Sequence, residues 1–237
     1  MRDPATSGPG AAPPFLFIPG ACHGAWCWQQ VLPFFNDARA IDLPRDPAAA
    51  SLDGHAQAIL ARIDRPAMLV AHSAGGFAAA ATAEAAPERV AGIIFICAYV
   101  PRSGESLAQM RRAQAENPMR GSYRLSPDRR SFTFAEDRLA DLFYHDCPPD
   151  TLPRALAHLH PEPVRPQETA LALRHLPQMP RAYVICTQDR AIPPAEQARM
   201  AAGMTTLSLP CGHAPFFAQP QALAQAIHTL AAGIRQV

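Results

Sequence analysis

One serine stands where a buried strand would run directly into a helix. The apolar run 67–71 precedes Ser73, and a helix-forming, Ala-rich stretch begins immediately after it. Ala71 and Gly75 complete the pattern small-x-Ser-x-Gly, which is typical of a sharp turn that exposes a nucleophilic serine. Such a turn holds the serine at a positive φ, and only small neighbours let the strand and the helix approach each other there. A chance turn of small residues is the alternative, but the flanking strand and helix favour Ser73 as a nucleophile.

A serine hydroxyl needs a base, itself oriented by a third group, to become a strong nucleophile. In chains with this turn, the acid follows the serine and the histidine comes last. Asp189 follows the apolar run 182–186, and His213 follows the run 206–209. Alone, Asp189 could cap the next helix and His213 could lie in a surface turn. Both, however, come after the C-terminal ends of expected strands, where parallel sheets place their sites. Their order and position predict a triad of Ser73, His213 and Asp189.

Two backbone N–H groups should stabilise the oxyanion that forms when a serine attacks an ester. The N–H of Ala74, directly after the serine, is one candidate. The N–H of Ala21 is the other, in the loop after the first apolar run, where Gly20 allows the backbone to come close to a substrate. We expect His23 to order this loop and His72 to pack or hydrogen-bond locally.

Short apolar runs alternate with segments of helical spacing, first over residues 15–100 and again over 178–237. Strands that read as continuous apolar runs and alternate with helices indicate a mostly parallel, doubly wound sheet covered on both faces. We expect Ser51 to be the N-cap of the second helix. The expected strands span 15–18, 40–43, 67–71, 90–97, 182–186 and 206–209, and the expected helices span 28–35, 51–63, 74–85, 195–202 and 219–234.

Residues 101–177 interrupt this alternation. They are rich in Pro and Arg and contain helix-like stretches at 139–144 and 151–159, so we predict a mostly helical cap over the sheet. The basic stretch within the cap is expected to be a solvated face rather than a binding patch. Residues 1–14 lack the basic start and long apolar run of a signal peptide, and we expect them to form a flexible tail.

Composition excludes several kinds of chemistry. All 21 basic residues are Arg, so the chain has no lysine for a Schiff base, a phosphate loop or a general base. A net charge of +1 favours neither a nucleic-acid nor a membrane-surface partner, and no apolar run has the length of a membrane helix. The six Cys show no paired metal-ligand spacing, so we expect free thiols in a cytoplasmic protein. We expect the short cluster 145–147 (His, Asp, Cys) to pack in the cap rather than to bind a metal.

These motifs together resemble the plant methylesterase and hydroxynitrile lyase family and its bacterial esterase relatives. The likeness extends through most of the chain after residue 14 and is carried by the stretches 19–28, 42–44, 71–76, 183–193 and 212–217, with Pro220. The resemblance implies an α/β-hydrolase fold in which residues 101–177 form the helical cap. It also implies that Ser73, Asp189 and His213 are the triad, that Ala21 and Ala74 are the oxyanion donors, and that no cofactor or metal takes part.

Three departures from the family pattern bear on the reaction. Pro19 stands where the family usually has His. The lyases carry Thr at the place of Gly20 and Lys at the place of Ala214, and their cyanohydrin cleavage needs that cation beside the departing cyanide. The cap has no Trp, a residue that family pockets often use, and three aromatic residues could replace it: Phe132, Phe134 and Phe143.

We therefore predict an esterase that acts on a small-molecule ester through an acyl-enzyme. A lyase and a non-catalytic small-ligand-binding protein of the same fold are the alternatives. The residues do not distinguish among esters, or between a monomer and a homodimer formed through the cap or an edge strand.

Overall fold

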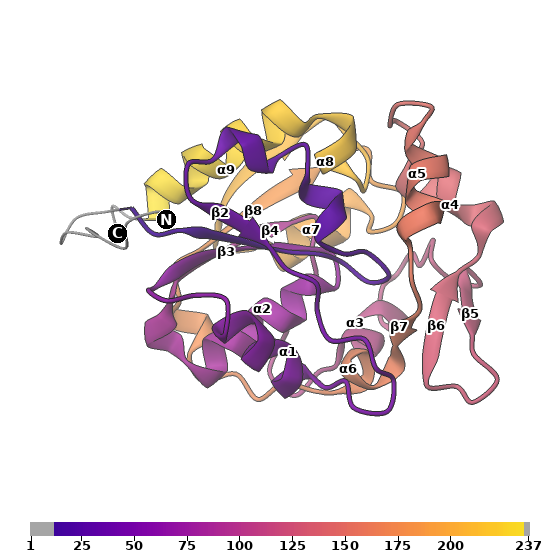
Figure 1. Ribbon diagram of the computed structural model, residues 1–237, viewed down its shortest axis with the longest axis horizontal. Helices are drawn as coiled ribbons and strands as arrows, with labels where there is room; N and C mark the ends of the chain where they lie inside the picture. The colour runs from indigo at the N-terminus through magenta and orange to yellow at the C-terminus, as the bar shows by residue number, and fades with distance from the viewer. Residues whose placement is uncertain (1–11, 235–237) are drawn as a thin grey trace, which may run out of the picture.

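The computed structural model describes residues 12–234 and contains a central sheet of six strands that are all parallel (Figure 1). The strands are β1 (Phe15–Ile18), β2 (Ala38–Ala40), β3 (Ala67–His72), β4 (Val90–Ile96), β8 (Arg181–Cys186) and β9 (Thr205–Leu209). Their order across the sheet is β2-β1-β3-β4-β8-β9. The chain thus moves from β1 outward to β2 and then returns past β1 to β3. Because of this reversal, the chain leaves β1 and β3 toward opposite edges of the sheet, and parallel sheets place their sites where the direction changes in this way.

Helices cover both faces of the sheet, as the sequence predicted (Figure 1). One face carries α1 (Leu52–Leu60), α2 (Gly75–Ala85) and α7 (Pro194–Met200), and the other carries α8 (Pro215–Ala218) and α9 (Pro220–Ile234). Strand β1 shows why its sequence is apolar throughout. Leu16 and Ile18 belong to the core beneath α1 and α2, whereas Phe17 belongs to the core beneath α9. Side chains alternate along a strand, so a strand covered on both faces needs apolar residues at every position.

Two predicted elements differ from the structure near the N-terminus. The helix expected over 28–35 is replaced by two 3-10 turns, η1 (Ala25–Trp28) and η2 (Leu32–Phe34), because Pro33 interrupts helical hydrogen bonding. The strand expected over 40–43 is displaced toward the N-terminus, because β2 spans residues 38–40. Asp42 lies after this strand, and its Oδ1 accepts a hydrogen bond of 3.0 Å from the Ala25 N–H. The other expected elements are present with ends that differ by a few residues, and Ser51 caps α1 by accepting from the Gly54 N–H.

Much of the segment between β4 and β8 lies at the right-hand end of the molecule in Figure 1, and residues 174–176, near its end, are hydrogen-bonded to Glu84 of α2. The segment contains the helices α3 (Leu107–Arg112), α4 (Glu136–Phe143), α5 (Thr151–His158) and α6 (Val164–Glu168), so the helical stretches expected at 139–144 and 151–159 are present. It also contains an antiparallel sheet that the sequence did not predict, formed by β5 (Tyr123–Leu125), β6 (Ser131–Phe134) and β7 (Glu162–Pro163). These strands are too short for an alternating pattern to be visible in the sequence.

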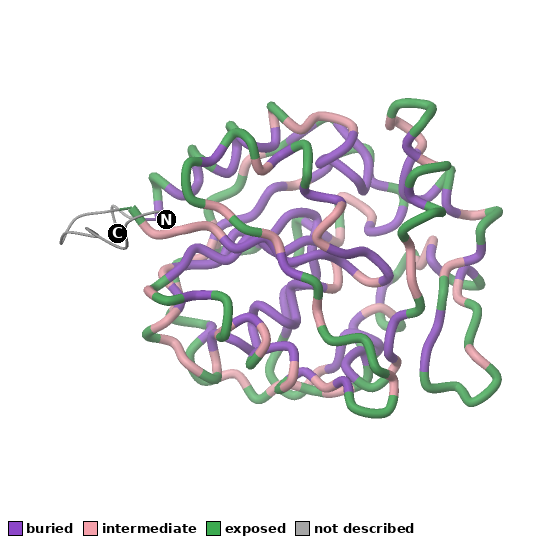
Figure 2. The backbone as a smooth tube through the Cα atoms, viewed as in Figure 1, coloured by how far each residue is buried: buried purple, intermediate pink, exposed green. Residues whose placement is uncertain are grey.

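Burial follows this architecture, as Figure 2 shows. The central strands are buried, and the outer loops of the segment between β4 and β8 are exposed. That segment is nevertheless packed on the sheet, because Leu139 and Phe143 belong to the same apolar core as Phe216 and α9. The predicted flexible tail, residues 1–14, lies almost entirely outside the described residues. Within residues 12–234, no helix has both the length and the apolar character needed to cross a membrane.

Gly76 provides a test of how closely α2 approaches the chain after β4. A Cβ atom at this position would overlap the carbonyl oxygen of Tyr99. We expect Gly76→Ala to lower the free energy of unfolding by about 2 kcal/mol or more, because the backbone must shift to relieve the overlap. Urea denaturation measures this change.

Gly233→Ala is the matched control, because a Cβ there meets no atom within 4 Å and Gly233 lies in α9. We expect that variant to gain about 0.5 kcal/mol, since alanine favours helix more than glycine does. Equal stabilities of the two variants would contradict the close packing of α2 against Tyr99.

Candidate active site

Ser73 lies in the turn between β3 and α2, with a φ of 51°. The positive φ expected from the sequence is therefore present in a residue that is not glycine. Glycines allow the close packing around it. A Cβ at Gly75 would lie 2.5 Å from the Pro19 carbonyl oxygen, and a Cβ at Gly20 would lie 2.8 Å from the Cβ of Ser73. The loops after β1 and β3 thus meet at the serine, and neither has room for a larger residue at these positions.

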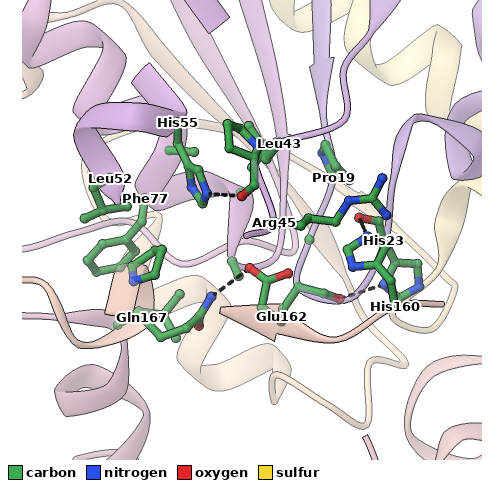
Figure 3. A pocket seen from close by; sticks show the side chains of 18 residues that line it. Pro19, His23, Leu43, Arg45, Leu52, His55, Phe77, His160, Glu162 and Gln167 are labelled. Carbon is green, nitrogen blue, oxygen red and sulfur yellow. Dashed lines mark hydrogen bonds between the residues drawn. The ribbon is translucent and has the colours of Figure 1, made fainter. Parts of the chain in front are cut away.

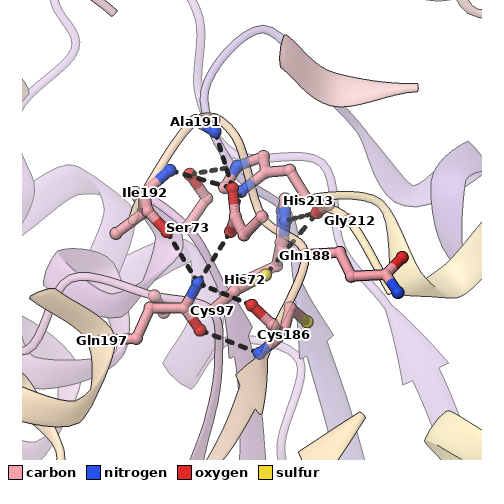
Figure 4. A network of polar contacts seen from close by, with 12 residues as sticks. His72, Ser73, Cys97, Cys186, Gln188, Ala191, Ile192, Gln197, Gly212 and His213 are labelled. Carbon is pink, nitrogen blue, oxygen red and sulfur yellow. Dashed lines mark hydrogen bonds and ion pairs between the residues drawn. The ribbon is translucent and has the colours of Figure 1, made fainter. Parts of the chain in front are cut away.

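The structure brings Ser73, His213 and Asp189 together, and Figure 4 shows Ser73 beside His213. His213 Nε2 lies 3.1 Å from Ser73 Oγ, and His213 Nδ1 lies 2.7 Å from Asp189 Oδ2. Because a carboxylate only accepts hydrogen bonds, Nδ1 carries the hydrogen, and Nε2 has a lone pair directed at the serine hydroxyl. The side chains of His213 and Asp189 are 3% and 0% exposed, so water hardly competes for these bonds.

The Asp189 carboxylate is held by hydrogen bonds in addition to the one from His213. Its Oδ1 accepts from the N–H groups of Ala191 at 2.7 Å and Ile192 at 2.9 Å, as expected if it caps the turn before α7. Its Oδ2 also accepts from Gln197 Nε2 at 2.9 Å. Burying a carboxylate is costly unless such donors compensate for the lost water, and these donors fix the orientation of the group.

Gln197, on α7, is a residue that sequence analysis missed. Its Nε2 also donates to the Ile192 carbonyl oxygen at 2.8 Å, and its Oε1 accepts from the Cys186 N–H at 2.9 Å. The fully buried side chain therefore joins the end of β8 to the loop that carries Asp189 (Figure 4). A single glutamine in an amphipathic helix gives no sign of this contact, because polar residues at helical spacing usually face water.

His72 packs behind the triad, as expected for a residue with a local role. Its Nε2 donates to the His213 carbonyl oxygen at 2.8 Å, and burial and then the neighbouring His213 place its pKa well below the usual value. Within the described part of the chain, His72, Cys97 and His213 also form a group with potential metal ligands. Both ring nitrogens of His213 are already hydrogen-bonded, and burial raises the pKa of the Cys97 thiol to about 12. Of the three side chains, His72 has a ring nitrogen without a hydrogen-bond partner, Nδ1, whereas both nitrogens of His213 are engaged, so a metal ion there would have to displace a bond of His213.

The two predicted oxyanion donors line the same cavity as the serine and the histidine. In the described residues, the N–H groups of Ala21 and Ala74 donate to no protein acceptor. The cavity volume beside Ser73 is about 20 Å³, which is room for about one water molecule. Phe134 and Phe143 also line it, whereas Phe132, the third aromatic residue named above, does not. Side chains around the cavity must therefore move when a larger molecule enters.

The Ala21 loop is tied to the segment between β4 and β8. His23 donates from Nδ1 to the Ala21 carbonyl oxygen at 2.9 Å, and its Nε2 accepts from the Tyr144 hydroxyl at 2.7 Å. Burial lowers the pKa of His23 to about 4, so the ring is neutral and keeps these roles near neutral pH. The prediction that His23 orders the loop is confirmed by these contacts.

A buried carboxyl group makes a second connection to this loop. Glu162, on β7, accepts a hydrogen bond of 3.0 Å from the N–H of Cys22, a residue with a φ of 62°. Figure 3 shows Glu162 and Gln167 beside each other in the cavity behind Ala21, which Arg45 also lines. Burial raises the pKa of Glu162 to about 7. Sequence analysis missed this residue, because it lies in a Pro-rich stretch without a recognisable motif.

The cluster 145–147 positions loops of the site. His145 is hydrogen-bonded through Nε2 to the Gln188 carbonyl oxygen at 3.0 Å, and Asp146 Oδ2 accepts from the Gly212 N–H at 2.6 Å. Gln188 and Gly212 directly precede Asp189 and His213, so these contacts position the loops that carry them. All six Cys are free thiols, as expected.

A family model described as the alpha/beta hydrolase family matches residues 15–226, and the chain therefore belongs to this family. Its sequence relatives include plant methylesterases. Methyl jasmonate esterase 1 from Vitis vinifera is 27% identical over 207 residues, covering 75% of this chain and 79% of the relative. Methylesterase 18 from Arabidopsis thaliana is 27% identical over 251 residues, covering 89% and 94%.

Solved structures share the fold. A pyrethroid hydrolase from Sphingobium faniae has a TM-score of 0.84 at 24% identity, over 96% of this chain and 100% of that one. A methylesterase from Arabidopsis has a TM-score of 0.79 at 17% identity, over 94% of this chain and 100% of that one. The predicted α/β-hydrolase fold and the resemblance to methylesterases are thus confirmed.

The buried Glu162 predicts a pH dependence of stability. Its pKa is about 7 in the fold against an ordinary value of 4.5, so the folded chain keeps a proton that the unfolded chain loses between these values. This group therefore lowers the free energy of unfolding as pH rises from about 4.5 to about 7, by on the order of 3 kcal/mol. Glu162→Gln retains an oxygen for the Cys22 N–H and cannot titrate. Relative to wild type, we expect the variant to gain stability over that interval.

Urea denaturation at about pH 5 and about pH 8 measures this difference. The contribution of His23, whose lowered pKa acts in the opposite direction, cancels because both proteins retain that residue. Glu168→Gln, an exposed site on α6, is the control and should keep the wild-type pH dependence. Parallel pH dependences of Glu162→Gln and wild type would contradict the raised pKa.

Proposed function

We propose that this protein is a serine hydrolase that cleaves small carboxylic esters through Ser73, His213 and Asp189. One observation carries the proposal, namely the continuous hydrogen-bonded chain from the serine hydroxyl through the imidazole to the buried carboxylate. The printed names of the relatives support the same chemistry, since two of them are a methyl jasmonate esterase and a methylesterase.

The geometry suggests how the residues act in turn. His213 Nε2 takes the proton of Ser73 as the Oγ forms a bond to the ester carbonyl carbon, and the Ala21 and Ala74 N–H groups bind the resulting oxyanion. The histidine then gives its proton to the leaving alcohol, which leaves an acyl group on the serine. Water activated by the same histidine releases the acid. Asp189 holds the ring in the required tautomer and stabilises its charged form.

We assign residues 15–100 and 178–237 to the hydrolase core and residues 101–177 to the cap. The cap residues Leu107, Tyr123, Phe134 and Phe143 give the cavity apolar walls, which suit the uncharged parts of an ester. No metal or cofactor has a role in this reaction. The free thiols suit a reducing compartment such as the cytoplasm.

The residues give less support to a lyase. In the related lyases a Thr stands at position 20, whereas here even a Cβ would press on Ser73. The lyase cation after the triad histidine is replaced by Ala214, which is 1% exposed. A non-catalytic binding protein would not need a hydroxyl–imidazole–carboxylate chain of this kind.

Replacing the nucleophile tests the proposal. We expect Ser73→Ala to lower kcat for 4-nitrophenyl acetate by roughly 10³-fold or more, because no other group can form the acyl-enzyme. Thermal unfolding checks that the variant is folded. Ser208→Ala, an exposed serine of β9, is the control and should retain wild-type turnover.

Undiminished turnover by Ser73→Ala would overturn the assignment. Cyanide release from mandelonitrile above background by the wild-type protein would favour the lyase. A wild-type protein that neither hydrolyses esters nor reacts with a fluorophosphonate probe would favour the binding protein.

The carboxylate can be tested without changing its size. In Asp189→Asn, an amide N–H facing His213 would favour the tautomer that cannot accept the serine proton, so we expect kcat to fall by roughly 10³-fold near neutral pH. KM should change much less, since Asp189 does not line the cavity. The control is Asp141→Asn, which changes an exposed aspartate paired with Arg190. Neither residue lines the cavity, so we expect kcat to change less than about twofold. If kcat were equal in Asp189→Asn and wild type, Asp189 could not be the residue that orients the histidine.

A further inference from the structure

Arg111 is a charged side chain that lines the same cavity as Ser73. It lies on α3, whose first turn is fixed by a capping box in which Ser106 Oγ accepts from the Gln109 N–H and Gln109 Oε1 accepts from the Ser106 N–H. Leu107 and Arg111 are four residues apart, so both lie on the helix face that borders the cavity. The helix thus directs a guanidinium group toward the site.

Arg111 differs from the other arginines of the basic stretch. The sequence suggested that this stretch is a solvated face, and the structure supports that for five exposed residues: Arg112, Arg120, Arg124, Arg129 and Arg130. Arg111, in contrast, is half-buried, and its guanidinium carbon lies 4.2 Å from the ring centroid of Tyr123. This stacking leaves the edge of the guanidinium, with its N–H groups, available for a ligand.

The charge of Arg111 has no counterpart in the protein. Among residues 12–234, every ion pair involves other groups, so the Arg111 guanidinium has no carboxylate partner, and the Tyr123 phenol is its polar neighbour. The phenols of Tyr99 and Tyr123 lie near it, but burial raises both pKa values, that of Tyr123 to about 12, so neither supplies a negative charge. No Asp or Glu lines the cavity. A cation that faces an otherwise largely apolar cavity favours an anion brought by the ligand.

We infer that Arg111 is a specificity-determining residue that binds a carboxylate carried by the ester substrate. The preferred substrates are then anionic esters, such as half-esters of dicarboxylic acids, which hydrolysis converts with one water into the diacid and an alcohol. The planar guanidinium matches a carboxylate through two parallel hydrogen bonds, and the Tyr123 ring holds it in place beforehand. This inference rests on the proposed esterase function, and it adds the class of ester to it.

Matched pairs of esters test the inference. Methyl hydrogen adipate and methyl hexanoate differ by a carboxylate on the acyl side, and both release methanol. 4-Acetoxybenzoate and 4-acetoxyacetophenone differ by a carboxylate on the alcohol side. In each pair, the ratio of kcat/KM for the anionic ester to that for the neutral ester isolates the charge, because general damage to the pocket affects both members.

The key variant is Arg111→Met, which keeps an unbranched side chain over Tyr123 and removes the charge. We expect it to lower the ratio roughly tenfold for at least one pair, mainly through a higher KM for the anionic ester. Arg111→Lys should retain part of the preference, because it keeps the charge without the planar fork. Arg112→Met removes the same charge from the exposed neighbouring residue and should leave the ratio at its wild-type value. Added salt should lower the ratio of the wild type.

Equal ratios in wild type and Arg111→Met for both pairs would overturn the inference, while Ser73-dependent turnover of the neutral esters would leave the proposed function intact. If the protein hydrolysed neither the four esters nor 4-nitrophenyl acetate and did not react with a fluorophosphonate probe, the proposed function would fail. Calorimetric titration with adipate and with 4-hydroxybenzoate then decides whether Arg111 binds a carboxylate. Weaker binding to Arg111→Met than to Arg112→Met supports an anion site, and equal binding to the two variants overturns it.

Discussion

The positive φ of Ser73 is the constraint on which the site depends. A left-handed conformation at a residue with a side chain costs on the order of 1–3 kcal/mol, and the surrounding packing must hold it. Here β3 is buried at every position before the serine, and α2 is packed against the chain on all sides. Gly20 and Gly75 bring the loops after β1 and β3 into contact at this point. The strained serine is therefore held by the same core that stabilises the whole sheet.

Burial has a second consequence at Asp189. A carboxylate with a fully buried side chain is stable only if protein groups replace its water, and here two backbone N–H groups, Gln197 and His213 do so. These bonds fix one orientation of the carboxylate, and the carboxylate in turn fixes the orientation of the His213 ring. Asp146, from the segment between β4 and β8, anchors the loop that carries His213 by accepting a hydrogen bond from the Gly212 N–H. The geometry of the three side chains is thus set by hydrogen bonds both from the core and from the insertion, as we call the segment between β4 and β8.

The sequence predicts the parts that repeat a simple pattern. The strands are predictable because burial on both faces requires apolar residues throughout, as in 67–71. The proximity of Ser73, Asp189 and His213 is predictable because each of them follows such a strand. The short strands of the insertion were missed because two to four residues show no alternation. Gln197 and Glu162 were missed for another reason. Each acts through one partner distant in the chain, and only the folded structure brings these residues together.

The loop around Ala21, a proposed oxyanion donor, shows how the insertion can bear on chemistry as well as on shape. Ala21 is held from two sides by residues of the insertion, since His23 bonds to the Tyr144 hydroxyl and Cys22 bonds to Glu162. The insertion also supplies Arg111 and the aromatic walls, and the cavity that remains is about 20 Å³. An entering ester must therefore displace side chains of the same segment that holds Ala21, a proposed oxyanion donor. We expect a ligand that fits the walls to leave the His23 and Glu162 bonds in place, and one that pushes the segment aside to disturb the N–H of Ala21. In the proposed mechanism, we therefore expect the fit of a substrate to the insertion to affect stabilisation of the oxyanion, and with it the reaction step as well as binding.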